Sequence, residues 1–458
     1  MVLLNALGYA GRGKLRWPQS LDPTGLANKG IKMSSEDWYR KRNYLHFDRP
    51  VSEKTAAKII KNPQTVAAHS FYPFINYSIH SSKIYKDDND QIAVKEKNRP
   101  ISYAAHLDSH IYSYYCHILT PLYEKQLRES DLERSILAFR KLGKSNVDFA
   151  FEAFNEIKSL GEKFGGCTAI GFDITGFFDN LDHDLLKQSW QQIINSDSLP
   201  DDHYAVFKSL TKYSKVDKQS LYKLLNISEH NPKNNRFRVC TPEEFRTIVR
   251  PNALIVKNLD QKGIPQGSPI SAFLSNIYML NFDKLMSEAV KEIGATYYRY
   301  CDDMLFIVPI EYESTLAGFV RKELNKLKID INPNKTEIRQ FISLANRFLS
   351  DKPLQYLGFL YDGEKILIRS AALAKYSERM RRGIRLAKKT KIKRNRIKIS
   401  IGQKPTKLYK RKIYERYSHL GGRNFIKYGL KAAKLMNSAA IKKQLKPLWN
   451  RLQEEIKK

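Results

Sequence analysis

Apolar and polar residues follow one another along this chain with spacings that predict both strands and helices. Residues 298–300 and 304–308 are rich in aromatic, β-branched and other apolar residues, and they indicate two strands flanking the acidic turn Asp302-Asp303. A second apolar run, 167–173, ends in Asp173 and leads through a glycine-containing turn into a helix expected to begin at Asp182 or His183. The pattern predicts an α+β fold.

Capping and turn residues predict the remaining elements. We expect helices over residues 36–69 (N-capped by Ser35 and again by Ser52), 107–127, from 271 onward and over 313–327, and strands over 82–85, 91–95 and 248–256. The first two of these strands flank the polar turn 87–90 and predict a hairpin. Residues 1–35 are rich in Gly and Pro, which indicates either an extended arm or a flexible terminus.

The composition fits a globular protein with two or three subdomains. The chain has 458 residues, of which 42% are hydrophobic and 28% charged. No apolar run reaches the roughly 18 residues of a membrane span, and residues 1–10 lack the basic leader of a signal peptide. The four cysteines are scattered, without a Cys-x-x-Cys pair, as expected for buried thiols in a cytoplasmic protein.

Positive charge is concentrated at the C-terminal end. The net charge is +32, and residues 371–458 hold 28 Lys and Arg against 4 Glu and no Asp, a net +24. Apolar residues recur through this segment at helical spacing, which favours helices over a disordered tail. Such a basic block predicts a polyanionic partner, most simply nucleic acid bound through its phosphates.

The acidic strand ends are the strongest chemical signal. An isolated Asp-Asp is usually a solvated turn, but these two carboxylates lie between apolar strands and need a counter-charge. Hard oxygen ligands suit Mg²⁺ or Mn²⁺. With Asp173, the pair Asp302 and Asp303 would hold two metals about 3.5–4 Å apart, a geometry suited to in-line attack on phosphate.

These residues resemble a known family. Tyr300–Asp303 resembles the Tyr-x-Asp-Asp box of reverse transcriptases, and 173–182 resembles their motif A as found in bacterial retroelement enzymes. Residues 261–276, with Pro265-Gln266-Gly267, resemble motif B. Residues 329–337 resemble motif D, 354–363 resemble the primer-grip hairpin, and the basic hairpin near residue 97 resembles the fingertip. The motifs occur in family order over roughly residues 80–365.

The resemblance implies the metal chemistry. Asp173, Asp302 and Asp303 would hold two Mg²⁺ ions, with Mn²⁺ as a substitute, and the backbone oxygen of Ile174 would complete a coordination shell. Lys335 in motif D would protonate the leaving pyrophosphate as a general acid. A solvated turn lysine is the alternative for Lys335.

The resemblance also implies the nucleotide contacts. Lys97 and Arg99 on the fingertip hairpin would reach the incoming triphosphate. Phe178, five residues after Asp173, would be the sugar gate that rejects a 2′-hydroxyl and selects deoxynucleotides, unless it is a core aromatic. Gln266 would contact the nascent base pair, and Gly267 would let the backbone approach it closely.

Nucleic-acid contacts are expected at three places. Residues 135–145 resemble the Gly-Phe-Arg segment of group II intron relatives without its glycine, the primer grip is expected at 354–363, and the basic block would clasp a duplex. The candidate residues are Arg140, Lys141, Lys144, Tyr356, Gly358, Arg381, Arg382, Arg385 and Lys389.

The implied architecture is a right-hand polymerase. We expect an N-terminal arm (1–35), fingers (36–165), a palm built on an RRM-like antiparallel sheet (166–365, with an insertion around 190–255) and a basic helical thumb (366–458). The partners would be an RNA template, an RNA–DNA duplex and deoxynucleoside triphosphates, with the oligomeric state open.

The subgroup is inferred from what the motifs lack. The sequence shows no second acidic cluster for RNase H, no Cys/His-rich tail, and no Asn-Ala-x-x-His or Val-Thr-Gly signature of retron enzymes. The nearest resemblance is to the bacterial "unknown group" of defence-associated reverse transcriptases, which implies antiphage defence and a dedicated structured noncoding RNA template. The alternatives are a retron-type or intron-derived enzyme, a non-catalytic RNA-binding protein and an RNA-dependent RNA polymerase.

Overall fold

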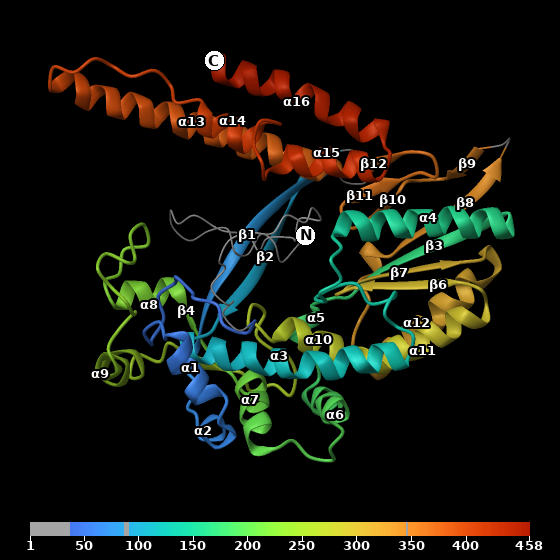
Figure 1. The fold of residues 1–458 in the computed structure, drawn as a ribbon, viewed down its shortest axis with the longest axis horizontal. Coiled ribbons are helices and arrows are strands. Elements are labelled where there is room, and N and C mark those ends of the chain that lie inside the picture. The colour runs from blue at the N-terminus through green and yellow to red at the C-terminus, as the bar shows by residue number, and fades with distance from the viewer. Residues whose placement is uncertain (1–36, 87–90, 345–346) are drawn as a thin grey trace, which may run out of the picture.

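The computed structural model describes residues 37–86, 91–344 and 347–458, and it is an α+β structure with three sheets and a helical C-terminal block (Figure 1). The predicted arm, the Ser35 cap and the hairpin turn 87–90 lie outside the described residues. The described part of the chain contains no helix that is long and apolar enough to cross a membrane. Its four cysteines are free thiols, and all but Cys116 are buried, as predicted.

The central sheet has five strands and is antiparallel throughout. Its order is β6 (Thr296–Tyr300), β7 (Asp303–Val308), β3 (Gly166–Asp173), β8 (Glu337–Leu344) and β9 (Arg347–Ser350). Helix α4 (Asn146–Phe164) covers one face, and α11 (Leu280–Glu292) and α12 (Glu313–Lys326) cover the other (Figure 1). The continuous apolar run of β7 is explained by this burial on both faces. The strands and helices predicted around both acidic sites and over 313–327 are confirmed.

A second sheet is mixed and carries the predicted hairpin. Its order is β2 (Ile92–Tyr103), β1 (Phe74–Lys86), β4 (Ser214–Asp217) and β5 (Ile255–Lys257), with β1 and β4 parallel. The strand expected over 248–256 is confirmed only at Ile255 and Val256, which lie in β5, because residues 248 and 249 end the π-helical turn Phe245–Val249 (η2) and residues 250–253 form a turn. Thr241 and Glu244 form a capping box that starts helical structure at α9 (Pro242–Glu244), and η2 continues it.

Helices surround this sheet and support the central one. They are α1 (Glu53–Ile60), α2 (Pro63–Ala67), α3 (His106–Glu129), α6 (His183–Ile194), α7 (Asp201–Thr211), α8 (Lys218–Leu224) and α10 (Ser271–Tyr278). Ser52 caps α1 by accepting a hydrogen bond from the Thr55 amide at 3.2 Å, as predicted. The first half of the helix expected over 36–69 is wrong: residues 39–52 contain no helix. There the Tyr44 hydroxyl donates to the Ala104 carbonyl at 2.8 Å, and this tertiary contact holds the segment extended along the start of α3.

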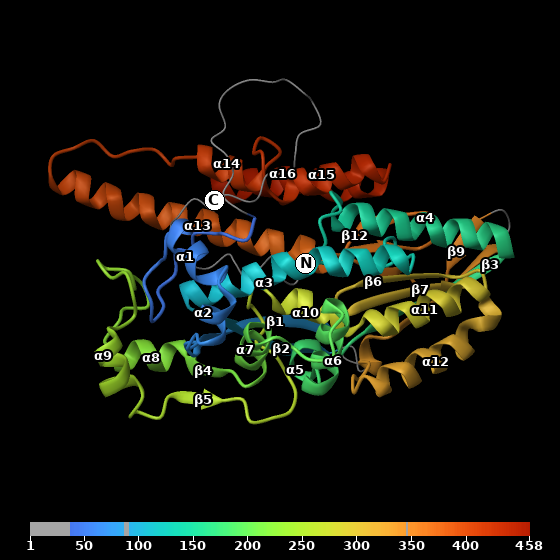
Figure 2. The same cartoon turned by 60° about the horizontal axis from the view of Figure 1, so that its bottom comes forward.

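The C-terminal block is helical, as predicted. A small sheet of β10 (Leu354–Tyr356), β11 (Phe359–Tyr361) and β12 (Ile366–Ile368) leads into α13 (Ser370–Ser400), α14 (Arg411–Tyr417), α15 (Phe425–Leu435) and α16 (Ala439–Lys457). The distal half of α13 projects beyond the helices packed on it (Figures 1 and 2). One hydrophobic core joins this block to α4 and one face of the central sheet, and another joins α3, α6, α10 and the opposite face.

Candidate active site

The predicted acidic residues meet at one end of the central sheet. Strands β3 and β7 are neighbours, and their antiparallel register places Asp173 opposite Asp303. The Ile174 amide donates to the Asp302 backbone carbonyl at 3.2 Å, which ties the strand end to the acidic turn. The residues that are far apart in sequence are therefore assembled by strand pairing.

The carboxylates repel one another. Protein groups around Asp303 partly desolvate its carboxylate and raise its pKa to about 7, and the neighbouring Asp302 and Asp173 carboxylates add to the rise. Burial also raises the pKa of Asp302. Full ionisation of this group is costly without a neighbouring cation.

The structure places Lys335 as that cation. Its ammonium group, in the short helix η4 (Pro333–Lys335), forms an ion pair with the Asp173 carboxylate. Within the described residues no group of three or more acidic, His or Cys side chains is already arranged to hold a metal. Three carboxylates at one end of the central sheet are nevertheless the hard-oxygen donor set that divalent cations prefer, and their mutual repulsion favours binding of one. The residues present therefore fit the predicted metal.

A glycine loop packs between the segment that follows Asp173 in the chain and the end of β2. Gly263 has φ +86°, and a Cβ there would lie 2.9 Å from the Asp179 carbonyl oxygen. Gly267 has φ +115°, and a Cβ would lie 2.7 Å from the Ser102 carbonyl oxygen at the end of β2. The Ser102 amide donates to the Gln266 carbonyl at 2.8 Å. Both glycines are needed because the loop is wedged between two backbone segments.

Phe178 is held against this loop. It lies in α5 (Phe177–Asn180), its side chain is half-buried, and its carbonyl accepts a hydrogen bond from the Ile264 amide at 2.9 Å. The Phe178 ring packs partly against the hydrophobic core, so its position is compatible both with a core aromatic and with a sugar gate.

The basic hairpin residues lie within the field of the acids. Burial lowers the pKa of Lys97, as do Arg99 and Lys335, while the carboxylates of Asp173 and Asp302 oppose the shift. Lys97 is exposed and Arg99 half-exposed on β2. Lys97 therefore borders the acidic site, and Arg99 lies two residues further along the same strand.

The residues predicted to contact the template differ in how far their side chains are exposed to solvent. The Arg140 side chain is only 2% exposed and binds both Glu124 carboxylate oxygens, at 2.9 and 2.7 Å. This structural role argues against Arg140 as a template contact. Lys144 remains at the surface, paired with Glu152 at 2.6 Å, and Lys141 is paired with Asp37 at 2.5 Å.

The primer-grip residues are partly internal. Tyr356 is 5% exposed and packs in the core beneath the C-terminal helices, so its side chain supports the hairpin and does not face a ligand. Gly358, with φ +94°, forms the turn between β10 and β11. The α13 candidates Arg381, Arg382, Arg385 and Lys389 are all exposed, and Arg381 lies 3.7 Å from Glu455.

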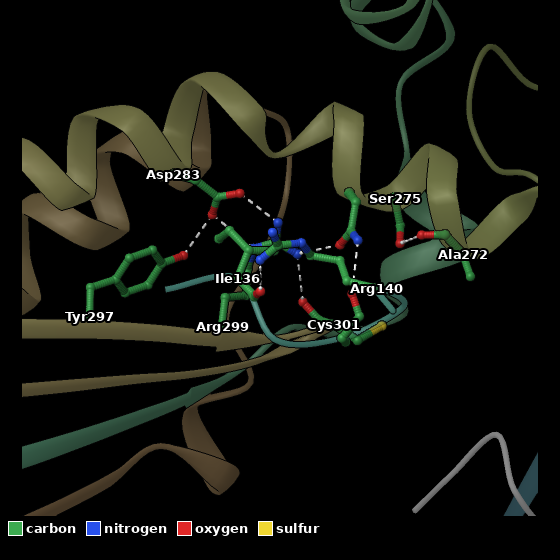
Figure 3. Close-up of polar contacts among 10 residues, drawn as sticks. Ile136, Arg140, Ala272, Ser275, Asp283, Tyr297, Arg299 and Cys301 are labelled. Atoms are coloured by element: carbon green, nitrogen blue, oxygen red, sulfur yellow. Dashed lines mark hydrogen bonds and ion pairs between the residues drawn. The ribbon is translucent and has the colours of Figure 1, made fainter. Parts of the chain in front are cut away.

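Sequence reasoning missed a buried polar network behind the acidic turn (Figure 3). The Arg299 guanidinium has no exposed surface and donates to Asp283 of α11 at 2.8 and 2.5 Å, while the Tyr297 hydroxyl donates to the same carboxylate at 2.8 Å. Arg299 also donates to Asn276 of α10 at 3.1 Å and to the Cys301 carbonyl at 3.3 Å.

This network holds the turn that carries the acids. Cys301 has φ +62°, a strained conformation for a residue with a side chain, and the Arg299 contact stabilises its carbonyl. The Arg299 backbone also exchanges hydrogen bonds with residues 135 and 137, at 2.8 and 2.9 Å. The available signal was a charged residue, Arg299, inside an otherwise apolar strand.

Acidic strand ends beside a glycine loop, with a basic block nearby, are typical of enzymes that transfer nucleotides to nucleic acids. The family model for reverse transcriptase (RNA-dependent DNA polymerase) matches residues 84–361, more than half of the chain. The chain therefore belongs to the reverse transcriptase family.

Similar solved structures are distant. The structure of apo telomerase from Candida tropicalis truncated from its C-terminal domain has 12% identity and a TM-score of 0.38, covering 69% of this chain and 60% of that one. The telomerase from Candida albicans in complex with a TWJ fragment of telomeric RNA has 14% identity and a TM-score of 0.37, covering 73% and 54%. The chain thus spans little more than half the length of these proteins. No curated protein matched it.

Proposed function

We propose that this chain is an RNA-directed DNA polymerase with a right-hand arrangement. Residues 36–165 would be the fingers, 166–365 the palm and 366–458 the thumb. The family membership and the position of the acids on the central sheet support this division. Figure 1 shows the β1–β2 hairpin extending toward the C-terminal helices, as fingers facing a thumb.

The observation that carries the proposal is the strand register that pairs Asp173 with Asp303. Asp173, Asp302 and Asp303, with the backbone oxygen of Ile174, would hold two Mg²⁺ or Mn²⁺ ions. Such ions activate a primer 3′-hydroxyl and neutralise the triphosphate and the leaving pyrophosphate. Lys335, whose ammonium already reaches Asp173, would supply the proton to pyrophosphate.

The residues around the acids would bind the nucleotide. Lys97 and Arg99 would pair with its triphosphate. Phe178 would exclude a 2′-hydroxyl and so disfavour ribonucleotides. Gln266 and Gly267 would abut the nascent base pair, because the loop that holds them is fixed between α5 and the end of β2.

The template is inferred to be a dedicated structured noncoding RNA, copied into cDNA in antiphage defence. The basic block supports a stable RNA complex, with Arg381, Arg382, Arg385 and Lys389 along α13 and Lys144 as further contacts. The defence role rests on the motif resemblance. A retron-type enzyme is the second candidate, and it would leave its DNA product covalently joined to the RNA.

The test is to purify the protein from cells and to sequence the RNA and DNA bound to it, beside the variant Asp302→Ala/Asp303→Ala. One enriched RNA in both proteins, with complementary DNA only in the wild type, is expected. Complementary DNA bound equally to the Asp302→Ala/Asp303→Ala variant would refute the assignment of these carboxylates to the active site. A mixed RNA population would refute the dedicated template.

A further inference from the structure

A cavity of about 330 Å³ lies in the C-terminal block, between the end of α14, helix α15 and helix α16. None of its lining residues belongs to the candidate active site. Its walls are apolar and aromatic, and include Tyr417, His419, Leu430 and Trp449. The volume is at the lower end of the roughly 300–1,000 Å³ of small-ligand pockets, so it suits a single flat group rather than a packed helix.

Trp449 gives the cavity an aromatic wall that is held in place. Its ring lies 4.9 Å from the His419 ring and 5.9 Å from the Tyr414 ring, measured between centroids. The Trp449 side chain is half-buried and is supported from the core beneath it. A half-covered, fixed indole is the kind of surface on which a nucleobase stacks, whatever its sequence.

The rim of the cavity is cationic. Lys442 and Lys446 line it from successive turns of α16, and both are exposed. In the described part of the chain neither ammonium lies within ion-pair distance of a carboxylate. Residues 416–453, which contain the whole cavity, hold nine Lys and Arg and no Asp or Glu. An anionic group at the rim is therefore favoured.

We propose that this cavity binds one unpaired nucleotide of an RNA, with its base against Trp449 and its flanking phosphates on Lys442 and Lys446. A nucleotide satisfies both the aromatic wall and the cationic rim, whereas an apolar peptide would leave the two lysines unmatched. The inference rests on the proposed function only in taking RNA as the polyanion. It adds a single-strand contact separate from the duplex expected along α13.

The test uses a short single-stranded RNA that contains one 2-aminopurine, whose fluorescence falls when it stacks on an aromatic ring. Wild type is expected to quench it. Trp449→Ala should remove most of the quenching and weaken binding on the order of tenfold, while Trp449→Phe should retain both. Lys442→Glu/Lys446→Glu should weaken binding and lower its salt dependence.

The matched control is Lys434→Glu/Lys443→Glu, which reverses two exposed charges in the same segment outside the cavity lining. It should keep the quenching. If Trp449→Ala does not fold, the test relies on Trp449→Phe and on Lys442→Glu/Lys446→Glu compared with the control pair. Unchanged quenching in Trp449→Ala, or equal losses in both lysine pairs, would overturn the proposal.

Primer extension on a homopolymer template separates this inference from the proposed function. The cavity variants should extend such a primer as wild type does. Asp302→Ala/Asp303→Ala should lose extension and keep the quenching. Quenching without extension in wild type would remove the polymerase proposal and leave the cavity assignment standing.

Discussion

Asp283→Asn tests whether the buried network behind the acidic turn positions the proposed catalytic acids. Asp283 and Arg299 have no exposed side-chain surface. Burial alone would lower the pKa of Arg299, but the Asp283 carboxylate outweighs it and raises the pKa above its ordinary value. The substitution keeps the side-chain shape and leaves the guanidinium buried without its counter-charge.

The expected cost follows from that geometry. Breaking one side of a buried ion pair costs about 3–5 kcal/mol of stability, because the remaining charge stays desolvated. The Tyr297 hydroxyl and Arg299 Nε both donate to Asp283 Oδ1, which an asparagine retains as an acceptor, whereas Arg299 Nη2 donates to Oδ2, where the asparagine NH2 group cannot accept. The apparent free energy of unfolding should fall by this amount in urea denaturation.

A second variant separates stability from positioning. Asp283→Leu/Arg299→Met removes both charges and should regain much of the stability, since apolar replacement of a buried pair is often neutral. The Cys301 carbonyl still loses its donor, so kcat for primer extension should stay reduced while RNA affinity is unchanged. A purely structural role would not give restored stability and unchanged RNA affinity together with a reduced kcat.

The control is Asp131→Asn, which breaks the exposed pair with Lys291 and should change neither stability nor kcat. The reasoning about the network is refuted if the unfolding free energy of Asp283→Asn lies within about 1 kcal/mol of the wild-type value, because an unpaired buried charge costs far more. Full kcat in the double variant would equally refute it.

Three further outcomes are expected. Gly267→Ala should abolish extension, because its Cβ would lie 2.7 Å from a β2 carbonyl at φ +115°, while Gly318→Ala, in open space, should be silent; equal activity in both would contradict the loop geometry. Phe178→Ala should raise ribonucleotide incorporation relative to deoxynucleotides in competition assays, and an unchanged ratio would remove the gate. His46 is buried and its Nδ1 accepts the Phe47 amide, so burial lowers its pKa to about 3. Because the unfolded chain binds that proton below about pH 6.5 and the folded chain does not, stability should fall from pH 6.5 toward 3, and less steeply in His46→Gln.

Local features of the sequence were sufficient for the elements that carry the chemistry. The Asp-Asp turn, the strand ending at Asp173, the Ser52 cap and the helix after the glycine loop all depend on neighbours a few residues away. Turn and cap preferences act over this range, so spacing alone predicts them. The basic C-terminal block was likewise visible as composition.

Long-range packing decided what the sequence could not. Whether a cation faces a ligand or a buried carboxylate depends on partners distant in the chain, and spacing does not show them. Arg140 is buried on Glu124, Tyr356 is in the core, and Arg299 meets Asp283 from another element. The first two residues of the strand expected at 248–256 belong instead to a π-helical turn that continues the helical structure begun at a preceding capping box. Periodicity identified the segments and their acids, whereas the desolvation of each charged group was settled only when the chain folded around it.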